Sequence, residues 1–374
     1  MPARLAMGYH APMKAVIPTL KYSLFLLFAG MMLQAGGLHA AEVAGLYQAN
    51  VEIGSRDDER QRNQAFTAGL RQVLVKLTGS SSTLNNPGLA SALGRAQSYV
   101  ETWAYSTGQT EGNIMLQVAY YESEIQRLLN QSGIPIWPQS RPETLLWVVV
   151  QDELGQPRLA GTPTAEAMDI LTSVQEIASQ RALPLLLPLM DFTDLSAMQP
   201  ALLWNFDMDA IRGASSRYNT ESILALRIVR LLNGEVIAKA RHIFRDRIQE
   251  FEIREAALLP FLEGSISMVA EELAANYAIL LSGISDSSQV NIHVEGINSR
   301  DDYAGLMSYL RGLAVVKDVR LVSVDGNELQ LVLGTGGQFR QLIESLALDK
   351  RLVALADPVR TNDQVSMRYA WQSP

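Results

Sequence analysis

The sequence predicts an α/β protein of the α+β type, built from three small mixed-sheet domains with packed helices. Its 374 residues exceed the length at which a single core stops growing. Its composition, 48% hydrophobic and 19% charged, is that of a globular chain. Segments that alternate hydrophobic and polar residues, as strands do, are interleaved with segments of helical spacing. Several compact cores are therefore expected, each with a sheet covered by helices.

Residues 1–40 are expected to be a cleavable signal peptide and not part of the fold. Positive charge at Lys14 and Lys21 precedes the apolar run 23–33, and small residues lead up to Ala40. The run is shorter than the roughly 20 residues that span a bilayer. Cleavage near Ala40 would release a chain without a transmembrane segment into the periplasm of a Gram-negative cell.

The composition after cleavage excludes several classes of function. Loss of residues 1–40 would leave 28 basic and 39 acidic residues, a net charge of about −11. Nucleic-acid binding needs clustered Lys and Arg, so it is not expected. The chain has no cysteine, which removes disulfides, thiol nucleophiles and lipidated cysteines. The sequence does not decide the oligomeric state, or whether the start codon is Met1 or Met13.

The first domain is expected at residues 41–135, in the order strand, helix, helix, strand, helix. Hydrophobic residues alternate from Tyr47 to Ile53, which predicts a half-buried strand. The next elements are predicted as a helix through 65–77 that stops at Gly79, a helix at 89–103, a strand at 114–121 and a short helix at 124–130. Three prolines mark residues 134–142 as a linker.

The second and third domains are expected at residues 143–281 and 289–357, followed by a tail at 358–374. The second domain has an apolar central strand at 145–150 and a hairpin around Asn233-Gly234. The third has a strand at 290–294, a helix at 301–311, strands at 318–324 and 329–333, a helix at 339–348 and a short strand at 352–355. That order is typical of a ferredoxin-like domain.

The tetrapeptide Ser-Arg-Asp-Asp occurs at 55–58 and again at 299–302, each time between a predicted strand and a predicted helix. Ser and Asp at a helix cap accept hydrogen bonds from first-turn amides, and acidic residues there oppose the positive end of the helix dipole. Neighbouring side chains diverge, so the paired acids are poorly placed for shared acid–base chemistry. We interpret both tetrapeptides as helix starts and not as a site that occurs twice.

No catalytic, cofactor-binding or metal site is predicted. The histidines left after cleavage are His242 and His293, both in predicted strands, where a pleat-surface residue is expected and not a catalyst. Two histidines without a cysteine are too few for a usual zinc site. Asp207 and Asp209 have the D-x-D spacing of a metal clamp, although a helix cap explains them equally well.

Aromatic residues provide the prediction of a partner surface. Most aromatic residues in strands are expected in the core. Trp103 with Tyr105, and Trp137 among prolines, are instead expected to be exposed. Aromatic residues are enriched in binding hot spots, so these three are the predicted partner contacts.

Three blocks of sequence resemble a known family. They are QVLVKLTG at 72–79, GIPIW at 133–137 and RPETLLWVVV at 141–150. In this order, after a signal peptide, they are similar to exported Gram-negative proteins catalogued as domain of unknown function 2066, which have no established activity. The order of elements also resembles the flagellar T-ring protein and, over 143–281, the amino-terminal domain of TolB. Those proteins are scaffolds, so this resemblance implies binding to other envelope proteins.

These observations lead to one main hypothesis and two alternatives. The chain is expected to be a non-enzymatic periplasmic adaptor or assembly factor that binds other cell-envelope proteins and needs no cofactor. The first alternative is a carboxylate-based hydrolase that uses Asp207 and Asp209. The second is a carrier that holds a small ligand or peptide in a cleft between domains.

The apolar face of the first long helix leads to a stability prediction. Leu70→Ala or Leu74→Ala should lower the free energy of unfolding by roughly 2 to 5 kcal/mol, as other core truncations do. Asp57→Ala should cost no more than about 1 kcal/mol, the value of a helix cap. Thermal unfolding of the variants tests this order, which is contradicted if the Asp57 variant unfolds first.

Overall fold

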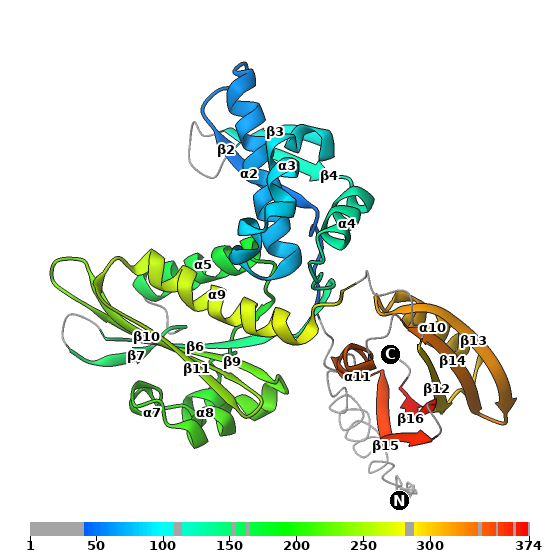
Figure 1. Ribbon diagram of the computed structural model, residues 1–374. Coiled ribbons are helices and arrows are strands. Elements are labelled where there is room, and N and C mark those ends of the chain that lie inside the picture. Colours follow the sequence, from blue (N-terminus) through cyan, green and yellow to red (C-terminus); the bar gives the residue numbers. More distant parts are fainter. Residues whose placement is uncertain are drawn as a thin grey trace, which may run out of the picture. The chain divides into compact units, whose positions relative to one another are not determined.

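The computed structural model describes residues 41–107, 114–151, 155–161, 165–280, 288–335, 339–348, 351–361 and 364–372. Its three larger sheets and their packed helices confirm the α+β class (Figure 1). A further pair of short strands joins β1 (Ala41–Glu42) to β5 (Ser140–Arg141). The predicted signal peptide lies outside the described residues. Within the described part of the chain, every helix lacks the combination of length and apolar character needed to cross a membrane.

The first sheet contains three antiparallel strands in the order β2 (Gln48–Ile53), β4 (Ile114–Tyr120) and β3 (Val100–Thr107). Helix α2 (Glu59–Thr78) buries its apolar face, with Leu70 and Leu74, against this sheet. The shorter helices around it are η1 (Ser81–Asn85), α3 (Pro87–Gly94), η2 (Ala96–Tyr99) and α4 (Glu122–Gln131). The first sheet and α2 thus form a core, as the alternation at 47–53 and the helical spacing at 65–77 predict.

The helix predicted at 89–103 is shorter than expected. Helix α3 ends at Gly94, η2 follows, and residues 100–107 form β3. The segment VETWAYST is rich in β-branched and aromatic residues, which fit a pleated surface, and pairing with β4 decides its conformation. Trp103 and Tyr105 therefore lie on a strand at the edge of the sheet.

The second sheet has the strand order β11-β10-β9-β6-β7, with β8 beside β6. The strands are β6 (Thr144–Gln151), β7 (Pro157–Leu159), β8 (Leu185–Leu186), β9 (Ser222–Arg230), β10 (Val236–Phe244) and β11 (Arg247–Ala256). The helices are α5 (Ala165–Gln180), α6 (Phe192–Ala197), α7 (Pro200–Trp204), α8 (Met208–Ser215) and α9 (Leu258–Tyr277). Helices α5 and α9 cover one face, and α7 and α8 cover the other (Figure 1). Strand β6 is consequently buried on both faces, as its apolar run predicts.

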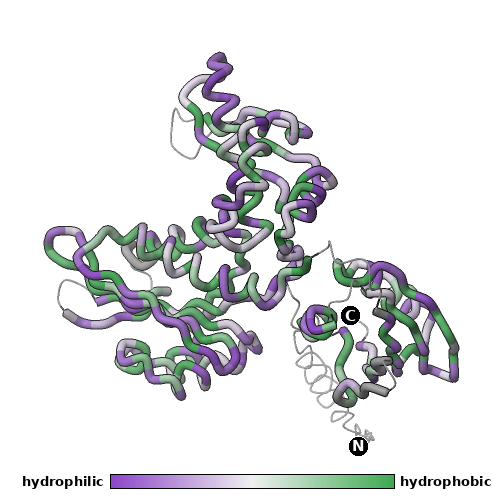
Figure 2. Tube along the Cα trace, in the orientation of Figure 1, coloured by the Kyte–Doolittle hydropathy of each residue, from purple (hydrophilic) through white to green (hydrophobic). Residues whose placement is uncertain are grey.

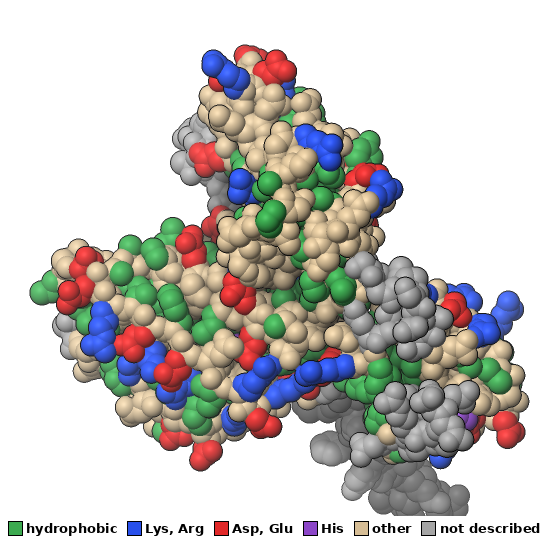
Figure 3. All heavy atoms as spheres, in the orientation of Figure 1, with side chains coloured by type: hydrophobic (Ala, Val, Ile, Leu, Met, Phe, Trp, Pro, Cys, Tyr) green, Lys and Arg blue, Asp and Glu red, His purple; other side chains and the backbone are tan. Residues whose placement is uncertain are grey.

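The predicted hairpin around Asn233-Gly234 is confirmed, because it joins β9 to the antiparallel β10. The next strand, β11, was not predicted. Its sequence, RIQEFEIREA, is half charged, and most of its side chains are exposed. Glu250 of β11 pairs with Lys239 at 2.7 Å and with Arg241 at 2.5 Å. Figure 3 shows acidic and basic side chains interleaved over this part of the surface.

The third sheet has the order β13-β14-β12-β16-β15. Its elements are β12 (Ser288–Glu295), α10 (Arg300–Gly312), β13 (Val316–Asp325), β14 (Glu328–Thr335), α11 (Phe339–Leu348), β15 (Leu352–Thr361) and β16 (Gln364–Trp371). The residues expected as a tail instead extend β15 and form β16, which pairs in parallel with β12. Met367, Tyr369 and Trp371 are buried at every second position, so contact with the core makes this segment a strand. The ferredoxin-like order holds for the other elements, with β16 inserted between β12 and β15.

Both Ser-Arg-Asp-Asp tetrapeptides start helices, as predicted, but through different residues. Asp58 caps α2, and its carboxylate accepts a hydrogen bond from the Arg60 N–H at 2.9 Å. Ser299 caps α10, and its hydroxyl accepts from the Asp302 N–H at 3.1 Å. The cap is the last residue of one tetrapeptide and the first of the other. The stabilisation due to capping of α2 therefore belongs to Asp58 and not to Asp57.

Arg141 of β5 is fully buried and joins three segments of the chain. Its guanidinium donates to the main-chain oxygens of Lys76, in the last turn of α2, and of Ala182, just after α5, each at 2.8 Å. It also lies 4.0 Å from the centre of the Trp137 ring. Among the described residues no carboxylate pairs with it, and the negative ends of two helix dipoles take that role. Burial lowers the pKa of Arg141 to about 9, so it stays charged at neutral pH.

Replacing this guanidinium should destabilise the fold. Arg141→Leu should lower the free energy of unfolding by about 3 kcal/mol, because the Lys76 and Ala182 oxygens lose their partner in the core. The control is Arg181→Leu, the same change at a half-buried arginine whose bond to the Gly79 oxygen is long, at 3.4 Å. The control should cost less than about 1 kcal/mol. Urea unfolding followed by circular dichroism compares the two, and equal losses would contradict the role of Arg141.

Candidate functional site

Two of the predicted contact residues, Trp103 and Tyr105, form a surface cluster with two arginines. Trp103 is 45% exposed, and its ring meets that of Tyr105 edge-on, with 5.3 Å between the ring centres. Arg62 lies over the Trp103 ring at 5.4 Å, and Arg56 lies over the Tyr105 ring at 5.7 Å. We call these four residues the β3 patch.

The β3 patch is held in place by contacts with α2 and with the corner before it. The buried Phe66 ring supports Trp103 from below, with 6.2 Å between the ring centres. The Tyr105 hydroxyl donates to the Arg56 oxygen at 2.8 Å. Arg62 belongs to the hydrophilic first turns of α2, which are purple in Figure 2. Because these contacts already order the rings, binding would cost little additional side-chain entropy.

Trp137, the third predicted contact residue, is fully buried, so the prediction that it is exposed is wrong. Arg141 covers its ring, and a Cβ atom on Gly79 would meet its Cε3 atom at 3.1 Å. The main-chain N–H of Trp137 donates to the Leu77 oxygen at 2.6 Å. The prolines around it suggested an exposed linker, but these tertiary contacts draw the ring into the core.

Asp207 and Asp209 start helix α8. The Asp207 carboxylate accepts from the Ala210 N–H at 3.0 Å, and Asp209 lies in the first turn, where it opposes the helix dipole. The start of α8 therefore accounts for both acids, Asp207 as its cap and Asp209 as a first-turn acid. Across the described ranges, no three His, Cys, Asp or Glu side chains are grouped so that they could hold a metal ion.

A chain of polar side chains is buried between the second sheet and α9. The Thr144 hydroxyl lies 2.8 Å from the Ser222 hydroxyl, which lies 2.9 Å from His242 Nε2. His242 Nδ1 lies 2.9 Å from Glu272 Oε2, although off the line of a well-formed hydrogen bond. This order of contacts, from a serine to a histidine to an acid, is that of a catalytic triad.

This polar chain is too deeply buried to work as a catalytic triad. Ser222 and His242 have 0% of their surface exposed, so a substrate does not reach the serine in this structure. Burial, reinforced by the charge of Arg247, lowers the pKa of His242 to about 4. The neutral ring can accept from Ser222 and direct an N–H towards Glu272. The expectation of a pleat-surface histidine is wrong, because α9 covers this part of β10.

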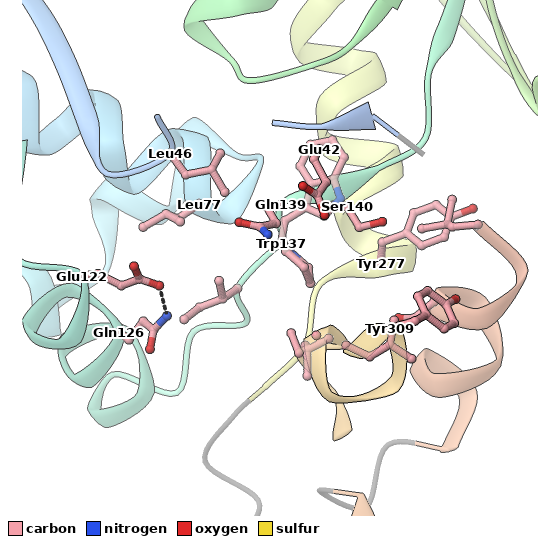
Figure 4. A pocket seen from close by; sticks show the side chains of 18 of the residues that line it. Glu42, Leu46, Leu77, Glu122, Gln126, Trp137, Gln139, Ser140, Tyr277 and Tyr309 are labelled. Carbon is pink, nitrogen blue, oxygen red and sulfur yellow. Dashed lines mark hydrogen bonds between the residues drawn. The ribbon is translucent and has the colours of Figure 1, made fainter. Parts of the chain in front are cut away.

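A cavity of about 780 Å³ lies beside Trp137 and Tyr277 (Figure 4). Its walls come from the segment before β2, the end of α2, α4, residues 136–140, the end of α9, α10 and α11. This volume is within the roughly 300 to 1,000 Å³ of small-ligand pockets. The lining residues are spread along the sequence without a local motif, which is why sequence patterns did not reveal the cavity.

The cavity combines apolar walls with charged and aromatic groups. Glu42 and Glu122 supply carboxylates, and the side-chain amide of Gln126 donates to Glu122 at 3.0 Å (Figure 4). Arg351 supplies a guanidinium, which lies 4.4 Å from the centre of the Tyr309 ring. Opposite charges on separate walls favour a ligand that itself carries both signs.

Comparison with known families identifies one part of the chain. Residues 40–138 match the family model of a domain of unknown function, DUF8605. The matched residues include the whole β3 patch. No curated protein matches the chain.

The expected resemblance to domain of unknown function 2066 is therefore wrong, and the comparisons do not support a likeness to the flagellar T-ring protein or to TolB. The blocks that suggested it are core segments. Leu74, Leu77 and nearly all of β6 are buried, and burial alone favours such apolar patterns in unrelated chains.

Two formyltetrahydrofolate deformylases are among the solved structures that are similar to part of the chain. The one from Pseudomonas putida KT2440 is 11% identical over 53% of this chain and 90% of that chain, with a TM-score of 0.16. The one from Burkholderia mallei ATCC 23344 is 12% identical over 53% and 89%, with a TM-score of 0.12. TM-scores this low support neither a shared fold nor a shared activity.

The buried histidine leads to a prediction about pH. Between about pH 6.5 and about pH 4, the unfolded chain binds a proton at His242 that the folded chain excludes. The stability due to neutral His242 is present above about pH 6.5 and is lost as the pH falls towards 4, by up to about 3 kcal/mol.

Burial raises the pKa of Glu272, so the contribution of Glu272 to stability changes with pH in the direction opposite to that of His242. The measurement therefore compares variants with the wild type. Urea unfolding across this pH range should show a smaller acid-induced loss for His242→Gln than for the wild type. His293→Gln, at a partly exposed histidine of the third sheet, is the control and should behave like the wild type. Parallel pH profiles for the wild type and His242→Gln would refute the prediction.

Proposed function

We propose that this protein is a non-enzymatic periplasmic adaptor or assembly factor, which binds other cell-envelope proteins through the β3 patch. The observation that carries the proposal is the exposed Trp103 ring, held between Tyr105 and Arg62 on an edge strand. Trp, Tyr and Arg are the residue types that dominate binding energy in protein interfaces. The expected signal peptide supports the periplasmic location.

The position of the patch indicates how a partner would bind. Among the strands that the structure describes, β3 pairs only with β4, so its other side can accept an added strand. Main-chain hydrogen bonds would hold an extended segment of the partner there. The rings of the patch would contact an apolar side chain, and Arg56 and Arg62 would favour an acidic side chain next to it.

The carboxylate-based hydrolase finds less support in the geometry. Asp207 and Asp209 are accounted for by helix capping, and the buried Ser222 and His242 are closed to substrate. The β3 patch, in contrast, presents ordered aromatic surface to solvent. Partner binding is therefore the function that the described side chains support best.

Crosslinking in cells tests the adaptor. A photo-crosslinking amino acid at exposed position Ala104 of β3, in the full chain, should join a defined envelope protein. Trp103→Ala or Arg62→Glu should lower the yield of that product about tenfold, because each removes a hot-spot side chain. The same amino acid at Leu232, which is 98% exposed in the hairpin loop, should not give this product.

A matched variant separates loss of binding from loss of folding. Arg60→Glu makes the same charge change as Arg62→Glu on the same exposed turn of α2, but Arg60 stacks on no ring of the patch. It should leave the crosslinking yield unchanged, and all three variants should unfold within a few degrees of the wild type. Equal yields from Trp103→Ala and the wild type would reject the β3 patch as the binding surface.

A further inference from the structure

We propose that strand β13 pairs in antiparallel orientation with β13 of a second copy of this chain, so that the third sheets of the two copies form one continuous sheet. This proposal goes beyond the adaptor function and does not depend on it. Among the strands that the structure describes, β13 pairs only with β14 and lies at the edge of its sheet (Figure 1). An edge strand presents main-chain N–H and C=O groups that can bind another strand.

The middle of β13 is apolar although it is open to solvent. Leu321 is 42% exposed, Val322 is 56% exposed and Val324 is 60% exposed. The register with β14 shifts between Leu321 and Ser323, so Val322 is an extra residue directly after Leu321. Apolar surface gathered in this way on an edge strand is typical of a contact surface, and an added strand would cover part of it.

The opposite edge of the third sheet is less suited to pairing. Strand β15 also exposes apolar side chains, at Val353 and Leu355. However, β15 contains Pro358, which has no N–H to donate, and its register with β16 shifts twice. Strand β13 contains no proline. We therefore assign the pairing edge to β13 and use β15 for the control.

Symmetry restricts the register of the pair. When two identical antiparallel strands share one sheet, the two-fold axis stands perpendicular to the sheet and passes between two facing copies of the same residue. With Leu321 as that central residue, Lys317 of each copy lies opposite Asp325 of the other copy. Opposite charges at facing positions stabilise a strand pair, so this register gains two ion pairs.

Lys317 and Asp325 are available for these ion pairs. Both side chains are exposed, and neither forms an ion pair with another residue that the structure describes. Charged residues on an edge strand oppose unspecific pairing. A self-complementary order of charges still permits pairing with an identical strand, and this complementarity is the reason for choosing a second copy as the partner.

Other registers lack these contacts. Moving the centre by one residue in either direction places Lys317 opposite Ser323 or Asn327, which carry no charge. A centre at position 319 would bring Asp318 opposite Arg320, but these two already form an ion pair within β13 at 3.4 Å. The charges therefore favour the register in which residues 317–325 of the two copies overlap.

Sedimentation velocity of the full chain over a range of concentrations tests the dimer. The wild type should dimerise with a Kd below about 1 mM. Lys317→Glu and Asp325→Lys each place two pairs of like charges opposite each other, so each should weaken dimerisation about tenfold or more. The control is Arg340→Glu, a similar charge reversal at an exposed position of α11, which should dimerise as the wild type does.

An equimolar mixture of the two single variants gives the sharpest comparison. In a mixed pair, the introduced glutamate of one copy faces the introduced lysine of the other, and the unchanged Asp325 faces the unchanged Lys317. The mixture should therefore dimerise at least as well as the wild type, although neither variant does so alone. Loss of folding in either variant could not produce this recovery.

A single introduced cysteine tests the register, because the chain has none of its own. Leu321→Cys should form a disulfide-linked dimer with oxidised glutathione, since facing Cβ atoms at the two-fold axis are about 4.5 to 5.5 Å apart and small shifts bring them to disulfide distance. Leu355→Cys, at a leucine of β15 that is 49% exposed, is the control and should give much less of this product.

Three results would overturn the proposal. They are a wild type that remains monomeric at about 1 mM, a mixture that dimerises no better than the single variants, and equal disulfide yields from Leu321→Cys and Leu355→Cys. Trp103→Ala should dimerise as the wild type does, so the outcome at β13 is independent of the outcome at the β3 patch.

Discussion

The buried guanidinium of Arg141 is the contact on which the junction between the first and second sheets depends. A helix leaves its last carbonyl groups without partners, and a buried charge needs compensation from its surroundings. At this junction the ends of α2 and α5 supply the carbonyls, and Arg141 supplies the donors and the charge. An apolar side chain would leave the carbonyls unpaired, and a lysine could not direct donors to several of them in one plane.

The same junction requires a close approach of the backbone. Gly79 adopts a φ of +72°, and a side chain there would collide with Ala274 of α9 and with the Trp137 ring. The segment from Ile136 to Arg141 is thereby held between α2 and α9 as a fixed wall. This wall is bonded to the Leu77 oxygen through the main-chain N–H of Trp137, and it lines one side of the cavity. A structural role for Trp137 thus replaces the surface role that its neighbouring prolines suggested.

The role of a side chain in this protein depends more on whether it is buried than on its residue type. Ser222, His242 and Glu272 have the chemistry of a triad, yet they lie in a closed interior, where they connect β9, β10 and α9. Buried polar contacts of this kind can select one register of a helix on a sheet, because other registers leave the groups unpaired. The aromatic residues of the β3 patch show the reverse case. Apolar side chains that would be stable in a core are held at an edge, with arginines over their rings.

The sequence by itself determined those features that depend on neighbours along the chain. The α+β class, strand β6, the β9–β10 hairpin and the helix starts at the two Ser-Arg-Asp-Asp tetrapeptides follow from periodicity, turn residues and capping, whereas the structure decided that Asp58 and Ser299 are the caps. The tertiary structure decided those features that depend on remote partners. Residues 100–107 form a strand because β4 pairs with them, and residues 364–371 form β16 because β12 and β15 flank them.

The same distinction holds for the candidate sites. The residue types at Trp103 and Tyr105 already indicated a contact surface, because aromatic residues are enriched in binding hot spots, although the sequence placed Trp103 at the end of a helix. The arginines over their rings and the cavity beside Trp137 come from segments separated by tens to hundreds of residues. Local patterns do not record which distant segments meet, since that depends on the total free energy of packing. Only the folded chain brings Glu42 and Arg351 to one cavity.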